Sequence, residues 1–211
     1  MGLVFYDYQM APSPRRARII LAEKQVPHET VQIDMTKAEQ LGDAYRAINP
    51  NCTIPALKLD DGTILTENSA IAAYLEATYP EPPLLGSTPL EKADIAGWQS
   101  KIEGEFAMSV AHAFRNSHPA MKGRALPGPE DYEQIPELSA RGLAQIDAFL
   151  DKLDARLEGR DFIASPGLSV ADITAGVTLD FAKIVKKGPR DTHANIARWH
   201  AALRERPSFN L

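Results

Sequence analysis

Over the first eighty residues, short apolar runs bounded by turn residues alternate with stretches in which apolar positions recur every three to four residues. The short runs are typical of strands, and the longer spacing is typical of amphipathic helices. The pattern predicts the order β-α-β-α-β-β-α, at residues 3–6, 13–25, 29–33, 37–48, 56–59, 63–65 and 67–78. An Asp-Asp-Gly turn at 60–62 indicates that the last two strands form a hairpin.

Beyond residue 80 the strand pattern stops. Residues 81–89 are rich in proline, which is typical of a linker. After this linker the apolar spacing is helical, and it predicts helices at 90–114, 137–157, 170–185 and 192–206, with a polar loop over 120–136. The sequence therefore predicts two domains, an α/β domain at 1–80 and an all-α domain at 90–211.

Two helix starts carry local signals. Ser13 followed by Pro14 predicts a start with Ser13 as the N-cap, because serine accepts from free N–H groups and proline fits the first helical turn. Ser169 is followed three residues later by Asp172, which predicts a capping box. We expect loss of the Ser169 cap to cost about 1 kcal/mol.

Composition excludes several function classes. The 211 residues carry a net charge of −5 and no block of basic residues, so a nucleic-acid partner is not expected. No apolar run reaches the roughly 20 residues of a membrane span, and the N-terminus fits a strand rather than a signal sequence, so we expect a cytoplasmic protein that does not bind membranes. The single Cys52 excludes an internal disulfide, and the five histidines lack metal-ligand spacing, so no metal is expected.

The most informative stretch joins a proline turn to a helix start. In N-P-N-C-T-I-P-A-L, at 49–57, Pro55 precedes a short strand and cannot donate to its ladder. A cis Ile54–Pro55 bond would leave the Ile54 backbone exposed as an edge for a bound peptide. Glu67 and Asn68 then open a helix, whose free N–H groups and positive dipole end suit a carboxylate. Together these features indicate a small anionic peptide as ligand.

Five segments, in order and at matching intervals, resemble those of the cytosolic glutathione transferases over essentially the full chain. They are S-P-R-R-A-R-I-I-L-A-E-K at 13–24, the Ile54-Pro55 turn, the Glu67-Asn68 helix start, the segment 168–174 and the ending N-I-A-R-W-H-A-A-L-R-E-R-P. The resemblance implies a thioredoxin-like first domain that binds glutathione and an all-α second domain that lines the pocket for the other substrate. It also implies a homodimer and a role in detoxification.

The resemblance assigns the glutathione contacts to Thr53, Ile54, Pro55, Glu67, Asn68 and Gln40. It implies that the Ile54 backbone pairs with the cysteinyl part, that Glu67 meets the γ-glutamyl ammonium and that Asn68 binds the γ-glutamyl carboxylate. Thr53 and Gln40 are placed near the glycine end. The family usually carries serine where this chain has Asn68, and asparagine retains a donor for the carboxylate.

Catalysis requires a group that stabilises the glutathione thiolate, because a free thiol has a pKa of about 8.5 and is mostly protonated at neutral pH. Many bacterial relatives carry a serine at this position, where the chain has Ala11, which cannot donate a hydrogen bond. Ser13 is the first candidate, at the position where a Nu-like pattern places a thiol-contacting asparagine. The backbone N–H groups of residues 11–13 and the phenol of Tyr6 are the alternatives.

Other residues give weaker signals. Cys52 neighbours the proline turn but stands where relatives commonly have glycine, so we interpret it as a small packed residue rather than a nucleophile. Residues that we expect near the pocket for the electrophile are Met10, Met108, His112, Phe114 and Arg115.

The sequence predicts a glutathione transferase that activates the glutathione thiol to attack a small hydrophobic electrophile or to exchange with a disulfide. An alternative is a non-catalytic glutathione- or ligand-binding protein of the same fold. A third hypothesis is a scaffold that binds a partner protein, because a fold does not fix a function.

Overall fold

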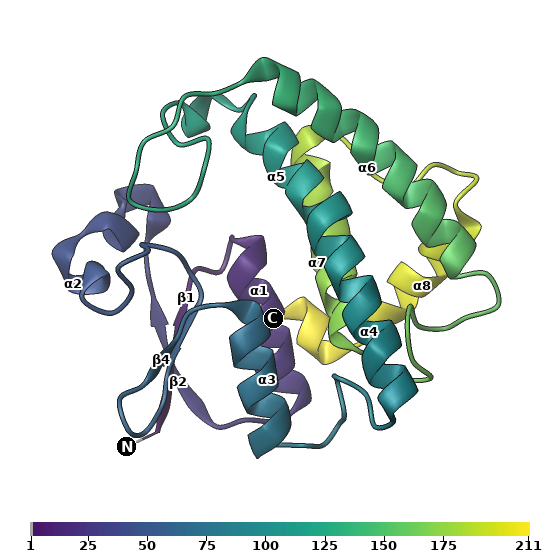
Figure 1. Cartoon of the computed structure of the whole chain (residues 1–211), viewed down its shortest axis with the longest axis horizontal. Coiled ribbons are helices and arrows are strands. Elements are labelled where there is room, and N and C mark those ends of the chain that lie inside the picture. Colours follow the sequence, from purple (N-terminus) through teal and green to yellow (C-terminus); the bar gives the residue numbers. More distant parts are fainter. Residues whose placement is uncertain (1) are drawn as a thin grey trace. The chain divides into compact units, whose positions relative to one another are not determined.

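The computed structural model describes residues 2–211. Contacts group these residues into two compact units (Figure 1). The first consists of the chain up to Pro82 together with Pro127–Asp131, and the second consists of Pro83–Leu126 and Tyr132–Leu211. Each unit is built around its own elements, and each is described separately below.

The first unit contains a four-stranded sheet with the strand order β2-β1-β3-β4. Strands β1 (Leu3–Asp7) and β2 (His28–Gln32) are parallel, and β3 (Ala56–Lys58) is antiparallel to both β1 and β4 (Ile64–Leu65). Helices α1 (Pro12–Glu23) and α3 (Asn68–Thr78) lie side by side and cover one face of the sheet (Figure 1). This mixed sheet is the predicted thioredoxin-like arrangement, and the predicted order of elements is confirmed.

Between β2 and β3 the chain forms short helical pieces, as predicted for this irregular stretch. They are two 3-10 turns, Met35–Lys37 and Glu39–Leu41, and the short helix α2, Asp43–Arg46. The hairpin between β3 and β4 is also confirmed, because Gly62 adopts a φ of 90° and donates to the carbonyl of Leu59 at 3.0 Å. Glycine adopts such a positive φ without a steric penalty.

The start of α1 differs from the prediction. Ser13 is not the N-cap; Ala11 occupies that position, without a side-chain cap, and Pro12 is the first helical residue. Proline is favoured there because the first helical N–H groups have no partner inside the helix and its φ already suits the helix. The helix therefore begins two residues earlier, and Ser13 lies inside its first turn with its hydroxyl available for other contacts.

Lys24 joins the C-terminal end of α1 to the C-terminal end of α3 through an ion pair and two hydrogen bonds. Its side chain is fully buried, and its Nζ lies 2.8 Å from Oε2 of Glu76. The same Nζ donates to the carbonyl oxygens of Tyr79 and Pro82, each at 2.8 Å. A single buried cation thus ties together the C-terminal ends of both helices that cover the sheet.

The second unit is helical, as predicted. Its first helical segment is continuous over three elements: α4 (Pro89–Lys101), a π-helical turn (Ile102–Ala107) and α5 (Met108–Arg115). A 3-10 turn at Pro119–Met121 and a loop follow this segment. Three further helices complete the unit: α6 (Pro136–Arg156), α7 (Val170–Ala182) and α8 (Ala194–Arg204). A 3-10 turn follows α7 at Lys183–Val185, and another follows α8 at Pro207–Asn210. Among the described residues, no helix combines the length and the apolar character needed to cross a membrane.

The predicted capping box of α7 is confirmed. Oδ2 of Asp172 accepts from the backbone N of Ser169 at 3.1 Å and from its Oγ at 2.8 Å. Oδ1 accepts from the backbone N of Ile163 at 2.8 Å and from Nε1 of Trp199 at 3.0 Å. Burial raises the pKa of Asp172, and these four donors act in the opposite direction. One carboxyl group therefore joins α7 to α8 and to the segment before α7.

Candidate functional site

The turn before β3 is held by two buried side chains. The Ile54–Pro55 bond is cis. The carbonyl oxygen of Thr53 accepts from the hydroxyl of Tyr45 at 2.7 Å and from Nδ2 of Asn49 at 2.7 Å. Asn49 is fully buried and Tyr45 is 2 % exposed, so water does not compete with either donor. The carbonyl just ahead of Ile54 is thus fixed in place.

The backbone of Ile54 is left for an external partner. Ala56 pairs with Tyr6 in the sheet, and Ile54 lies just before the first paired residue of β3. Within residues 2–211, no hydrogen bond is made to the N–H or the C=O of Ile54. Unpaired backbone groups next to a strand are the groups that an extended peptide uses when it adds to a sheet.

Sequence reasoning missed Asn49 and Tyr45. The signal for Asn49 was present, because an Asn-Pro dipeptide favours a turn and an asparagine side chain can bond its own backbone two residues on. In the structure Oδ1 of Asn49 accepts from the backbone N of Asn51 at 3.0 Å. Tyr45 carries no comparable local signal, and its role depends on a contact that forms only in the fold.

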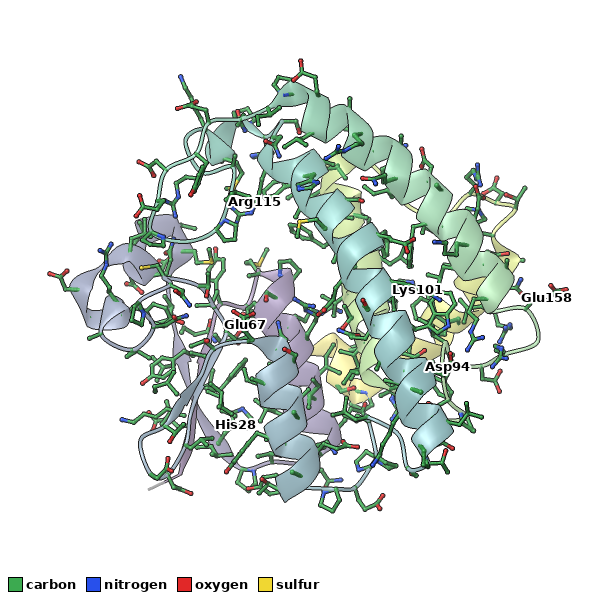
Figure 2. The ribbon with its side chains drawn as sticks, viewed as in Figure 1. His28, Glu67, Asp94, Lys101, Arg115 and Glu158 are labelled. Carbon is green, nitrogen blue, oxygen red and sulfur yellow. The ribbon has the colours of Figure 1, made fainter. Side chains whose placement is uncertain are left out.

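The starts of α1 and α3 meet at Ser13. Nδ2 of Asn68, the first residue of α3, donates to Oγ of Ser13 at 2.9 Å, and Nη2 of Arg16 donates to the same oxygen at 3.4 Å. Glu67 precedes Asn68 as the N-cap of α3, makes no side-chain cap bond and is exposed (Figure 2). The structure therefore places the predicted thiol donor beside the predicted carboxylate site.

The hydroxyl of Ser13 retains its own hydrogen atom as a donor. A serine oxygen accepts through two lone pairs and donates one O–H. Because Asn68 and Arg16 both donate to Oγ of Ser13, its own O–H remains able to donate to another group. The other oxygen of the amide, Oδ1 of Asn68, is buried and has no partner among the described residues.

Among the backbone N–H groups of residues 11–13, Ser13 has the one that remains available. The N–H of Ala11 donates to the carbonyl of Tyr8 at 3.0 Å. Pro12 has no N–H. The sequence predicted that either a hydroxyl or a backbone N–H of this loop stabilises the thiolate. Ser13 carries both of these groups.

Tyr6 lies in an apolar cluster of the first unit. It is 9 % exposed, and its ring packs edge-on against Tyr45 with the centroids 6.0 Å apart. The same cluster contains Ile33, Ile54 and Ala56. These contacts account for Tyr6 as a packing residue.

Gln40 and Cys52 are both buried. Gln40 lies in the second 3-10 turn at 8 % exposure, and its Oε1 has no partner among the described residues. Cys52 is 3 % exposed and has a φ of 54°, a left-handed conformation that glycine adopts most easily. A glycine would adopt this backbone conformation at position 52 at a lower steric cost than cysteine does.

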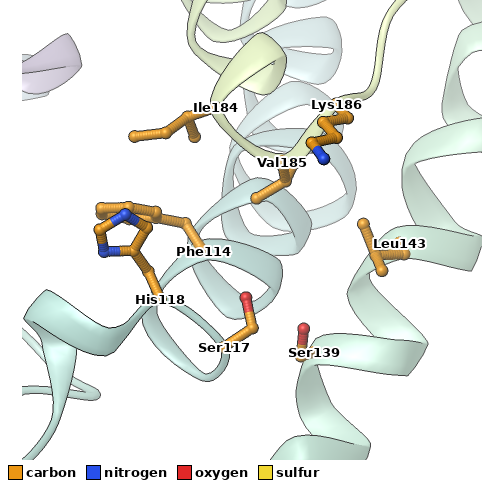
Figure 3. Close-up of a pocket in the computed structure, with 8 residues that line it drawn as sticks. All are labelled: Phe114, Ser117, His118, Ser139, Leu143, Ile184, Val185 and Lys186. Atoms are coloured by element: carbon orange, nitrogen blue, oxygen red, sulfur yellow. The ribbon is translucent and has the colours of Figure 1, made fainter.

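The second unit contains a pocket of about 220 Å³ at the end of α5 (Figure 3). Its lining combines apolar and polar side chains: Phe114, Ser117, His118, Ser139, Leu143, Ile184, Val185 and Lys186. The ring of Phe114 packs edge-on against Phe181, with the centroids 5.5 Å apart. Of the five residues expected near an electrophile pocket, Phe114 lines this one. Among the described residues, no cluster of three potential metal ligands occurs.

Four of the five expected residues do not line that pocket. Met10 belongs to the first unit and is 77 % exposed. Met108, His112 and Arg115 lie along α5, where helical spacing puts them on one face. Burial lowers the pKa of Arg115, and the nearby positive charge of Arg124 lowers it further.

Comparison with known proteins gives consistent matches. The family model for the N-terminal domain of glutathione S-transferases matches residues 11–78, and the model for their C-terminal domain matches residues 136–202. Glutathione S-transferase 2 of Saccharomyces cerevisiae is 34 % identical over 211 residues, which cover 98 % of this chain and 87 % of that protein. FtsZ-localized protein A of Caulobacter vibrioides is 25 % identical, over 97 % of this chain and 87 % of that protein.

The fold is also found in solved structures. The crystal structure of a glutathione S-transferase domain-containing protein from Marinobacter aquaeolei VT8 superposes with a TM-score of 0.88 at 31 % identity. That match covers 98 % of this chain and 99 % of the other.

Proposed function

Because this chain belongs to the cytosolic glutathione transferase family, we propose that it binds glutathione and activates its thiol as a thiolate. The thiolate then attacks a small hydrophobic electrophile or exchanges with a disulfide. The observation that carries the proposal is the hydrogen bond from Asn68 to Ser13, because it leaves the Ser13 hydroxyl as a donor at the shared start of two helices. Family membership supplies the glutathione-dependent chemistry, and the residue roles below are part of the proposal.

In the proposed complex, glutathione lies along the turn before β3. The unpaired N–H and C=O of Ile54 bond to the cysteinyl part, and cis-Pro55 shapes the turn. Glu67 is exposed and faces the γ-glutamyl ammonium. The side-chain amide of Asn68 already bonds to Ser13, so the γ-glutamyl carboxylate is bound by the free N–H groups at the start of α3.

Thr53 and Gln40 are the residues that we place near the glycine end of glutathione. Oγ1 of Thr53 accepts from Nδ2 of Asn49 at 3.1 Å, so the hydroxyl can still donate to a glycine carboxylate. Gln40 would need to turn its amide outward to reach glutathione, because its side chain is buried. We therefore assign the glycine end first to Thr53 and second to Gln40.

Thiolate formation at this site is energetically accessible. Lowering a thiol pKa by one unit requires about 1.4 kcal/mol of selective stabilisation of the anion. A hydrogen bond from the Ser13 hydroxyl and the positive end of α1 together contribute about this amount. Ser13 acts through its hydroxyl in this proposal, with its backbone N–H as the alternative and Tyr6 as the least favoured donor.

Each of the two domains has its own role in the proposed function. Residues 1–80 form the glutathione-binding domain, 81–89 form the linker and 90–211 form the domain that lines the second-substrate pocket. The protein acts as a cytoplasmic homodimer. Light scattering that gives the mass of a single chain at micromolar concentration contradicts the dimer and leaves the thiol chemistry to be judged by its own assays.

A second candidate function is a non-catalytic glutathione-binding protein. Alanine at position 11 favours it, since this position supplies a hydroxyl in many bacterial relatives. The transferase remains the stronger candidate because Ser13 provides a hydroxyl near the same loop.

Calorimetric titration with reduced glutathione, followed by turnover assays, tests both candidates. We expect glutathione to bind and to react with chlorodinitrobenzene or with hydroxyethyl disulfide, and the preferred substrate identifies the chemistry. Binding without turnover of either substrate selects the non-catalytic protein. No binding at millimolar glutathione contradicts both and leaves the scaffold hypothesis. Ser13→Ala then identifies the donor, because it removes the hydroxyl and retains the backbone N–H.

A further inference from the structure

Asp7, the last residue of β1, carries a buried carboxylate that binds the guanidinium of Arg18 on α1 at two points. Oδ2 of Asp7 accepts from Nε of Arg18 at 3.0 Å, and Oδ1 accepts from Nη2 at 2.8 Å. The side chain of Asp7 is 3 % exposed and that of Arg18 is 12 % exposed. A two-point contact between a carboxylate and a guanidinium fixes the orientation of the two groups as well as their distance.

The same carboxylate also holds the loop that joins β1 to α1. Nε2 of Gln32 donates to Oδ2 of Asp7 at 3.1 Å, and Oε1 of Gln32 accepts from the backbone N of Gln9 at 3.2 Å. Gln32 ends β2 and lies opposite Asp7 in the parallel register of the sheet. Asp7 is therefore connected to α1 through Arg18 and to the loop through Gln32.

The position of Ser13 depends on the contact between Asp7 and Arg18. Ser13 lies in the first turn of α1, and Arg18 follows it by about one and a half turns. Because hydrogen bonds join successive turns of a helix, a rotation of α1 that separates Arg18 from Asp7 also displaces Ser13. Such a displacement would weaken the 2.9 Å hydrogen bond from Asn68 to Ser13 and redirect the Ser13 hydroxyl.

A second buried ion pair holds the other end of α1. Lys24 follows Ser13 by about three turns, and it contacts Glu76 and the carbonyl oxygens of Tyr79 and Pro82. The two ends of the helix are thus held by separate sets of contacts. One set can be removed by mutation while the other is retained.

We infer that Asp7, Arg18 and Gln32 are positioning residues for the thiol chemistry, because together they hold Ser13 where its hydroxyl can donate to the glutathione sulfur. The inference rests on the proposed function for the role of Ser13. The structural part, in which these contacts hold Ser13 beside Asn68, does not depend on glutathione.

Asp7→Asn distinguishes positioning from a simple charge effect by the sign of its result. Removal of a negative charge near a thiolate stabilises the anion and lowers the thiol pKa, whereas loss of a hydrogen bond to the thiolate raises that pKa. We expect the pKa of bound glutathione, measured as thiolate absorbance against pH, to rise by about half a unit to one unit. An unchanged or lowered pKa in the folded variant overturns the inference.

Lys24→Met is the matched control for lost stability. It removes a buried ion pair from the far end of the same helix, so it should lower the melting temperature and leave the pKa of bound glutathione unchanged. A rise of equal size in Lys24→Met and Asp7→Asn shows that any destabilisation of α1 acts on the thiol, and it overturns the assignment to Asp7.

Two milder variants apply if Asp7→Asn does not fold. Gln32→Ala truncates an exposed residue and disconnects the loop, so it should raise the thiol pKa by about a third of a unit at little cost in stability. Arg18→Lys retains the charge but loses the two-point contact, and it should also raise the pKa. Thr30→Ala, at an exposed position of β2, should leave the pKa unchanged. Equal pKa values in all three variants overturn the inference.

A thiol introduced by Ser13→Cys, in a Cys52→Ser background, tests the positioning without glutathione. This thiol occupies the place where Asn68 and Arg16 donate, and the pH dependence of its alkylation by iodoacetamide gives its pKa. Adding Asp7→Asn should raise this pKa by about half a unit, although the removed charge alone would lower it. No rise overturns the inference.

The two thiol measurements separate this inference from the proposed function. A rise at the introduced thiol, in a chain that binds no glutathione before that substitution, contradicts the proposed function alone. Glutathione turnover by the wild-type chain, with no rise of either thiol pKa in the Asp7→Asn variants, contradicts the positioning role alone.

Discussion

The side-chain amide of Asn68 donates to the hydroxyl of Ser13 at 2.9 Å, across 55 positions of sequence. This bond joins the first turns of α1 and α3, the two helices that cover the sheet. Because the amide donates, the oxygen of Ser13 accepts, and the Ser13 hydroxyl keeps its own hydrogen atom for another acceptor. The bond therefore orients the hydroxyl that we propose as the thiolate donor.

We predict that Asn68→Ala raises the pKa of enzyme-bound glutathione by about half a unit to one unit, because Ser13 loses the donor that orients its hydroxyl. A higher thiol pKa lowers the thiolate fraction below that pKa and leaves it unchanged well above it. Turnover should therefore fall about three- to tenfold near pH 6.5 and little near pH 9.5. The pH dependence of kcat/KM and of thiolate absorbance measures the shift.

Thr78→Ala, at the exposed far end of α3, is the matched control and should leave both pH profiles unchanged. A uniform loss of rate at all pH values in Asn68→Ala would instead mean that Asn68 binds substrate and does not orient Ser13.

The stability of the first unit should depend on Lys24. Lys24→Met retains the length of the side chain but leaves Glu76 and the carbonyls of Tyr79 and Pro82 without their cation. Removing one partner of a buried ion pair should lower the free energy of unfolding by about 3 kcal/mol. Urea unfolding measures this change. Lys37→Met removes a lysine side chain that is 73 % exposed and should change stability by no more than about 0.5 kcal/mol.

The order and type of the elements could be predicted because they depend on local pattern. Strand periodicity, the Asp-Asp-Gly turn and the Ser169–Asp172 spacing each act over a few residues. The error at Ser13 has a local cause as well. Pro12 and Pro14 both fit a first helical turn, and the prediction did not weigh Pro12 as the first residue.

The candidate site could be predicted only in part, for a different physical reason. Ile54, Glu67 and Asn68 were predicted from turn and helix-start chemistry, and their contacts with glutathione stay a prediction. Two hydrogen bonds of the site are tertiary contacts that no local pattern encodes. They run from Asn68 to Ser13 and from Tyr45 to the carbonyl of Thr53. The hydrogen bond from Nη1 of Arg115 to the carbonyl oxygen of Arg124 likewise forms only when the loop after α5 folds back.

The capping box of α7 should contribute more to stability than an ordinary helix cap. Asp172→Asn replaces the oxygen that accepts from the backbone N–H and the hydroxyl of Ser169 with an NH2 group, so donors face donors at a fully buried site. We expect the free energy of unfolding to fall by about 2–4 kcal/mol, since charge-assisted bonds are lost and polar groups are left unpaired. Thermal and urea unfolding measure the loss. Asp161→Asn, at a side chain that is 89 % exposed, should have no measurable effect.

The thiol of Cys52 should be unreactive toward reagents in the folded protein. It is 3 % exposed, and its Sγ lies 3.5 Å from the carbonyl oxygen of Pro50, so a thiol reagent cannot reach it without local opening. We expect Ellman's reagent to react slowly with the native chain and fast in denaturant, and Cys52→Ser to retain full turnover. Cys52→Gly should lose little stability, because relief of the left-handed backbone offsets the lost packing. Cys52→Val introduces a β-branched side chain at the same φ and should be clearly less stable than Cys52→Gly. Rapid labelling of the native thiol, or loss of turnover in Cys52→Ser, would place Cys52 in the chemistry and remove Ser13 as the sole activating residue.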